Sequence, residues 1–159
     1  MGRMDGTRSA PEIVTVSAVT TAVVRDTVAM NELPAFFDRT FGHLAETLGA
    51  QGVAFAGAAF ACYHGQPTET VDLEVGFPTA QPVEAASDVI ASSLPAGEVA
   101  RVVHEGAYDH LGHSWGQLAE WIQAQGRVPG DTLWEIYVTE PTPDMNPDDL
   151  RTELNWLLG

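Results

Sequence analysis

A glutamate interrupts an apolar strand pattern in the last third of the chain, at Trp134-Glu135-Ile136-Tyr137. Because strand side chains alternate between two faces, Glu135 and Tyr137 share a face. A carboxylate beside an aromatic ring can neutralise an organic cation, and the ring adds about 0.5 to 2 kcal/mol of cation–π attraction. Desolvation can instead raise the proton affinity of the carboxylate, which suits it to general acid or base catalysis.

A duplication gives this glutamate a counterpart. Residues 42–68 recur without a gap at residues 116–142, with ten identities in 27 positions. Tyr63 then corresponds to Tyr137, and Ala61 corresponds to Glu135. If the halves pack about an approximate twofold axis, the two tyrosines face a central cleft with Glu135 near its floor, and Ala61 leaves room for a ligand. We expect a site for a lipophilic, flat or cationic compound.

Matching elements must position these residues. Helices are predicted from Pro34 to Gly49 or Gly52 and, in the second half, up to Gly126. Strands are predicted at residues 12–19, 58–64, 70–77, 98–104, 132–139 and 151–157, with a loop before the first helix and a linker at 79–95. Each half reads as strand, helix, strand, strand, which predicts an α+β fold with helices layered on an antiparallel sheet.

Both helices carry an apolar stripe with steps of four, three and four residues. The stripes are Phe37, Phe41, Leu44 and Leu48 in the first helix and Leu111, Trp115, Leu118 and Ile122 in the second. Both are expected to face the core, and Trp115 is also a candidate ligand contact in the cleft.

Length and charge bound the possible functions. The 159 residues, 45% of them apolar, predict a single domain over residues 12–158, with halves at about 12–78 and 96–158 and a disordered tail at 1–11. A net charge of −15 argues against nucleic acid and anionic membranes as partners. The chain lacks a signal peptide and an apolar run of roughly 20 residues, so a cytoplasmic location is expected.

Other reactive residues have simpler explanations. His110 and His113 have a spacing that can hold a metal ion, but no third ligand accompanies them, so no metal is expected. Cys62 lies on the strand face opposite Tyr63 and is interpreted as a small core residue rather than a nucleophile, while His64 is interpreted as a surface or strand-end residue. No phosphate-binding loop or serine-hydrolase motif is present, and no cofactor is expected. Glu135 itself could be an exposed strand residue, and the tyrosines ordinary core aromatics.

Several segments together resemble the GyrI-like family, the effector-binding domain of AraC- and MerR-type multidrug regulators. They are residues 98–108, residues 134–137, the start of the last strand at 151–154, and residues 63–65 and 72–76 in the first half. The resemblance covers nearly all of residues 12–158. It implies two SHS2-type modules related by a pseudo-twofold axis, with a curved antiparallel sheet, two main helices and a central pocket.

The resemblance also implies site residues and partners. The family's pocket glutamate falls on Glu135, and its pocket aromatics fall on Tyr63, Tyr108 and Tyr137. Only a short segment precedes the first strand, which leaves no room for a helix-turn-helix domain, so a stand-alone member without direct DNA contact is expected.

The family offers more than one function. Some relatives sense or sequester drugs and toxins and so contribute to antibiotic resistance; binding of this kind is the favoured expectation. Others resemble cofactor-free hydrolases that open the cyclopropane of DNA-alkylating natural products. In such an enzyme Glu135 would orient a water while Tyr137 or Tyr63 stabilises the developing oxyanion. The family name also suggests contact with DNA gyrase.

Overall fold

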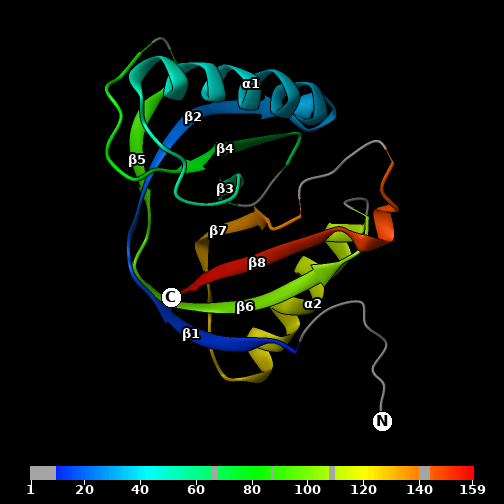
Figure 1. The fold of residues 1–159 in the computed structure, drawn as a ribbon. Helices are drawn as coiled ribbons and strands as arrows, with labels where there is room; N and C mark the ends of the chain where they lie inside the picture. The colour runs from blue at the N-terminus through cyan, green and yellow to red at the C-terminus, as the bar shows by residue number, and fades with distance from the viewer. Residues whose placement is uncertain (1–9, 66–67, 87, 108–109, 140–143) are drawn as a thin grey trace.

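The computed structural model describes residues 10–65, 68–86, 88–107, 110–139 and 144–159. Within them lie one antiparallel sheet, two α-helices and two short 3-10 helices (Figure 1). The elements are β1 (Glu12–Val16), β2 (Val19–Ala29), η1 (Met30–Glu32), α1 (Leu33–Gln51), β3 (Phe60–His64), β4 (Thr70–Pro78), β5 (Ile90–Leu94), β6 (Gly97–Glu105), α2 (Leu111–Ala124), β7 (Pro129–Tyr137), η3 (Pro147–Asp149) and β8 (Arg151–Leu158).

The strand order makes the duplication visible in three dimensions. The sheet has eight strands in the order β1-β6-β8-β7-β3-β4-β2-β5, so β3 and β7 meet at its centre. Reading outward from that centre, β3, β4 and β2 correspond to β7, β8 and β6. The fold is therefore α+β, with two SHS2-type modules related by a pseudo-twofold axis, as predicted.

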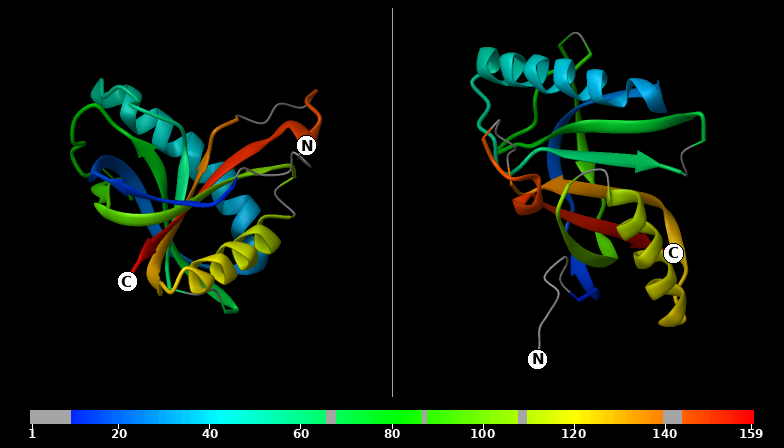
Figure 2. Two further views of the ribbon diagram at one scale, coloured as in Figure 1. Left: turned by 90° about the horizontal axis from the view of Figure 1, so that it is seen from below. Right: turned by 90° about the vertical axis from the view of Figure 1, so that its right-hand side faces the viewer.

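The two outermost strands are exchanged between the halves. β1, which precedes β2, pairs with β6 of the second half, while β5, which precedes β6, pairs with β2 of the first half. The strand predicted at residues 12–19 is β1, which ends at Val16, and the first-half counterpart of β6 is β2 rather than β1. β1 continues into β2 through only Ser17 and Ala18, and β5 continues into β6 through only Pro95 and Ala96, so each of these segments passes directly from one half to the other, as the blue segment does in Figure 2.

Two strands, β2 and β5, lie where a loop and a linker were predicted. Thr21, Ala22, Val23 and Val24 are consecutive buried residues in β2, because both faces of the sheet are covered there. Such a strand has no polar alternation to reveal it. β5 is short and three of its five residues are exposed, so its sequence has no clear apolar period.

Both helices end close to the predicted glycines. α1 stops at Gly52, whose φ of 69° is left-handed, and Gly126 after α2 has a φ of 74°. Glycine adopts this conformation without the steric cost that a Cβ would impose. No helix in the described part of the chain is long and apolar enough to cross a membrane.

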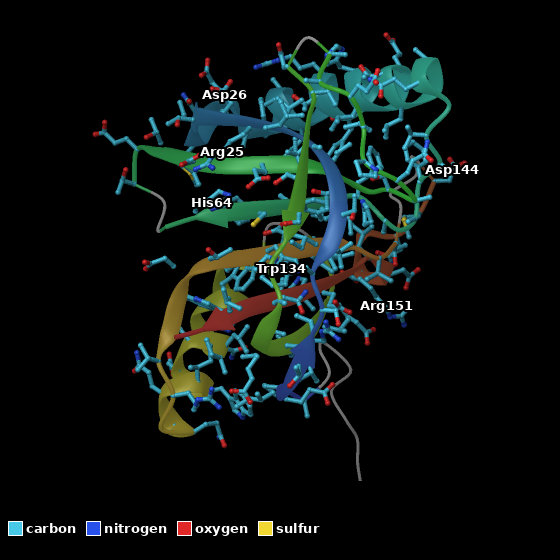
Figure 3. The ribbon with its side chains drawn as sticks, turned by 90° about the vertical axis from the view of Figure 1, so that its left-hand side faces the viewer. Arg25, Asp26, His64, Trp134, Asp144 and Arg151 are labelled. Carbon is cyan, nitrogen blue, oxygen red and sulfur yellow. The ribbon has the colours of Figure 1, made fainter. Side chains whose placement is uncertain are left out.

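Apolar side chains cover both faces of the sheet. On one face, α1 packs on β2 and β4 while α2 packs on β6 and β7, and each helix has its own core cluster. On the opposite face, a third cluster includes Val23, Phe60, Cys62 and Trp134; Figure 3 views the molecule with Trp134 labelled. Residues 60–62 of β3 and 133–135 of β7 are buried at the centre of the sheet.

Candidate functional site

A large cleft lies on the helix-bearing face, between α1 and α2. It has a volume of about 1520 Å³, larger than the roughly 300 to 1,000 Å³ of common small-molecule sites. Its floor comes from the central strands, through Tyr63 of β3 and Leu133, Glu135 and Tyr137 of β7. The two halves therefore contribute opposite walls to one concave site.

The first turns of both helices line this cleft. Phe37 and Phe41 of α1 are half-buried and border the cleft, as are their counterparts Leu111 and Trp115 in α2. Only the later residues of each predicted stripe, such as Leu44, are buried in the core. Phe37 and Phe41 pack against the α1 cluster, and Leu111 and Trp115 pack against the α2 cluster, so both stripes face the core as predicted while their first residues also line the cleft.

Aromatic pairs repeat across the pseudo-twofold axis. Phe41 and Phe77 make an edge contact with ring centroids 5.6 Å apart, and Trp115 and Trp156 make one at the same 5.6 Å. Strand pairing makes Trp156 the counterpart of Phe77, as helix alignment makes Trp115 the counterpart of Phe41. The second half thus uses tryptophans where the first uses phenylalanines.

Glu135 lies at the centre of the floor and is 4% exposed. The Tyr137 hydroxyl donates to its Oε2 at 2.9 Å, and Nε1 of Trp115 donates to its Oε1 at 3.3 Å. Tyr63 also hydrogen-bonds the carboxyl group from the other half. Three aromatic donors from both halves therefore hold one carboxylate in place.

Burial dominates the acid–base properties of this group. It raises the pKa of Glu135 above its ordinary value, although the hydrogen bonds from Tyr137, Trp115 and Tyr63 act in the opposite direction. Burial and then the neighbouring Glu135 raise the pKa of Tyr63 well above its usual value. The tyrosine therefore remains a neutral hydroxyl at physiological pH.

No basic side chain accompanies Glu135 among the described residues. The sequence contains seven arginines and no lysine. Four of the described ones pair with other carboxylates, and Arg39 lies over the Phe36 ring. The other charged residue lining the cleft, Asp38, is also acidic. The cleft thus holds a buried carboxylate without an internal counter-ion.

The sequence comparison identifies the family. A family model described as the GyrI-like small molecule binding domain matches residues 9–158. The chain belongs to the GyrI-like family. No match was found among curated proteins.

Solved structures share this GyrI-like fold at low sequence identity. EcmrR in complex with DNA has a TM-score of 0.84 at 17% identity over 96% of this chain; the match spans only 57% of that EcmrR chain. The isolated EcmrR C-terminal domain has a TM-score of 0.83 at 15% identity, with 94% of this chain and 97% of that chain covered.

Two further structures carry functional descriptions. A hydrolase from Listeria innocua has a TM-score of 0.68 at 13% identity, with 98% of this chain and 94% of that one covered. SAV2435 bound to tetraphenylphosphonium has a TM-score of 0.66 at 10% identity, covering 95% of this chain and 94% of that one.

The GyrI-like domain brings together most of the residues singled out in the sequence. Glu135, Tyr63, Tyr137 and Trp115 all line the cleft. Ala61 is fully buried in the α1 cluster, directly opposite Glu135 in the β3–β7 ladder, and is not part of the cleft lining. Tyr108 lies outside the described residues.

Several lining residues were not expected to contact a ligand. Trp156, Phe55 and Phe77 line the cleft but were not singled out in the sequence; the rings of Phe55 and Phe77 stack with their centroids 4.5 Å apart in the first-half wall. The duplication contained a usable signal, because Gly42 and Ala45 recur as Gly116 and Ala119 and all four line the cleft. Small residues repeated on both helices are typical of walls that must leave space.

The histidines and the cysteine that were not assigned to the site lie away from the cleft. His110 and His113 are exposed. Cys62 is 3% exposed on the opposite sheet face, and burial raises the pKa of its thiol to about 12. A thiol with such a pKa is a poor nucleophile at neutral pH.

Proposed function

We propose that this GyrI-like domain binds bulky lipophilic cations, in drug or toxin sensing or sequestration. The observation that carries the proposal is Glu135, a carboxylate that is buried in an aromatic cleft and has no basic partner among the described residues. Leaving a charge uncompensated in such a place costs free energy, and a bound cation would supply the missing charge.

The cleft walls suit such a ligand. Phe37, Phe41 and Phe77 present ring edges and faces from one half, while Trp115 and Trp156 present theirs from the other. Aromatic faces attract cations and pack against lipophilic groups. SAV2435, which shares the fold, has been solved with tetraphenylphosphonium, a cation of this class.

Tetraphenylphosphonium is therefore the first ligand to test. Calorimetric titration of the wild type and of Glu135→Gln should show at least about a tenfold loss of affinity in the variant, equivalent to about 1.4 kcal/mol or more. Asp38→Asn is the matched control: it removes a negative charge from the exposed rim of the cleft and should change the affinity less. The neutral compound triphenylphosphine oxide should bind both proteins similarly.

The pH dependence of the same titration tests the carboxylate directly. The raised pKa of Glu135 means that the charged form is lost as the pH falls through a value above the usual glutamate range. Wild-type affinity for the cation should fall along with it, while the affinity of Glu135→Gln stays flat. Equal affinities for the cation in the two proteins at neutral pH would contradict the proposal.

Hydrolysis of a reactive natural product is the second candidate function. It is supported by the 2.9 Å hydrogen bond between Tyr137 and Glu135, which pairs a carboxyl of raised pKa with a phenol able to stabilise an oxyanion. Incubation with a cyclopropane-bearing alkylating compound, followed by mass spectrometry, separates the candidates. Catalytic ring opening by the wild type, lost in Glu135→Gln with binding retained, would identify an enzyme.

A further inference from the structure

A second polar cluster lies on the sheet face opposite the cleft. Cys62 of β3 and Glu74 of β4 are direct partners in the β3–β4 ladder, and His64 lies two residues along β3 on the same face. Donor atoms of the three side chains all lie within 4.8 Å of one another. Figure 3 labels His64 in this part of the sheet.

The carboxylate at the centre of the cluster is held in place. Glu74 is 8% exposed; its Oε2 lies 2.5 Å from Nε2 of His64, and its Oε1 accepts a hydrogen bond from Ser92 at 2.8 Å. Cys62 is covered by the apolar cluster on this face, whereas His64 is half-buried and gives access from solvent. The donors are thus oriented before any ligand arrives.

Arg25, the nearby basic residue, forms its hydrogen bonds with Asp72 rather than with Glu74. Arg25 is the β2 partner of Glu74, but its guanidinium forms two hydrogen bonds with Asp72, at 2.9 and 3.2 Å. The oxygens of Glu74 therefore face the imidazole, the thiol and the Ser92 hydroxyl.

The second half provides an internal comparison. Strand pairing makes Glu153 the counterpart of Glu74, and there it lies opposite Ile136 and 3.4 Å from Arg101. The positions of Cys62 and His64 are taken by Ile136 and Val138. The strand pair forms without a thiol or an imidazole, so these donors in the first half are not a requirement of the fold.

We propose that Cys62, His64 and Glu74 form a binding site for a zinc-type divalent ion. One thiolate, one imidazole and one carboxylate are a ligand set that such ions accept, and three protein ligands leave a fourth position for water. Tetrahedral coordination places ligand atoms about 3.3 to 3.6 Å apart. The 2.5 Å contact between His64 and Glu74 must therefore open by roughly 1 Å, and the wider separations, which reach at most 4.8 Å, must contract. Binding releases the thiol proton and displaces the proton shared by Nε2 of His64 and Glu74, which moves to Nδ1 or to solvent; the thiolate and the carboxylate then balance the charge of the ion.

Cobalt(II) is the probe, because a cobalt–thiolate bond absorbs in the near ultraviolet. The untagged protein, freed of metal by a chelator, should take up one equivalent of cobalt with a thiolate charge-transfer band, and zinc should displace it. Cys62→Ser should abolish the band, and His64→Gln should weaken binding at least tenfold. Ser92→Ala, which removes the hydrogen bond that orients Glu74, should weaken it about tenfold.

His113→Gln is the matched control and should bind like the wild type, because His113 is an exposed histidine distant in sequence from the cluster. Circular dichroism checks the fold of each variant; if the buried Cys62→Ser variant unfolds, the half-exposed His64→Gln variant decides the test. Absence of a thiolate band at excess cobalt would overturn the proposal, as would uptake that is unchanged in His64→Gln.

Discussion

The two central strands, β3 and β7, are equivalent in the duplicated halves, but they carry their polar side chains on opposite faces of the sheet. Across the pseudo-twofold axis, Ala61 faces the helix side where Glu135 does, while Cys62 and His64 face the other side where Ile136 and a valine stand. Only the tyrosines, Tyr63 and its counterpart, are retained. A duplicated strand can therefore acquire a polar site on either face, provided that the partner strand keeps that face apolar.

The second half has Glu135 where the first half has Ala61, and the helices differ at a neighbouring position as well. Trp115, which donates to the carboxylate, stands where the first half has Phe41, a residue without a donor. A buried carboxylate and its donor thus occur in the same half. This pairing indicates that the charge was accommodated by its surroundings, because a buried charge without hydrogen bonds is strongly destabilising.

The largest effect is expected when a carboxylate is introduced into the first half at the position equivalent to Glu135. Ala61→Glu would place a second carboxylate opposite Glu135 in a fully buried position whose helix neighbour is phenylalanine. We expect a loss of about 3 to 5 kcal/mol in the free energy of unfolding at neutral pH, measured with urea. The loss should shrink at acidic pH, where the carboxyls are protonated. Ala61→Ser is the control for size, and a wild-type stability for Ala61→Glu would contradict this view of the strand.

A smaller effect is expected when the hydrogen-bond donor on α2 is replaced by its first-half counterpart. Trp115→Phe copies the first-half residue and deletes the hydrogen bond to Oε1 of Glu135. We expect the pKa of Glu135 to rise further, since that bond favours the charged form, and the protein to lose about 1 to 2 kcal/mol of stability at neutral pH. Titration of the carboxyl resonance by ¹³C NMR measures the pKa. Trp121→Phe, on the same helix but away from the cleft lining, should leave the pKa unchanged.

The smallest effect on stability is expected at the glycine that both helices share, Gly42 in α1 and Gly116 in α2. A Cβ added at Gly42 or at Gly116 would meet nothing within 4 Å. Gly→Ala at either position should stabilise its helix by about 0.5 to 1 kcal/mol, measured by thermal unfolding, because alanine loses less backbone freedom. Affinity for tetraphenylphosphonium should fall by less than tenfold in both variants. A destabilised variant would show that the space is not open.

Much of the fold could be predicted from the sequence because the duplication marks its own boundaries. The helices, the central strands and the glycines that end α1 and α2 all follow from apolar period and repeat spacing. β2 was missed because its central residues are buried on both sides. β1 was recognised as a strand, but its pairing with β6 could not be predicted, because residue alternation does not reveal which half a strand pairs with; β5 was missed because most of its residues are exposed.

The floor of the candidate site followed from strand parity, and its walls did not. Parity places Glu135 and Tyr137 on one face as soon as the strand is recognised, and the repeat adds Tyr63. Which aromatic residues border the cleft depends on how the helices pack on the sheet, and this is a tertiary property. The Cys62–His64–Glu74 cluster joins neighbouring strands across ten residues or more, so its components look unrelated in the sequence.

The exchanged outer strands bear on how the molecule can move and unfold. Pulling the halves apart would break the β3–β7 ladder and, at the same time, the β1–β6 and β2–β5 ladders at the two edges. The two halves are therefore joined by three strand pairings, and we expect that neither half can hinge away while the other stays folded. We expect a single cooperative unfolding transition, and a cleft that adapts to ligands of different size by rotating its aromatic side chains rather than by opening.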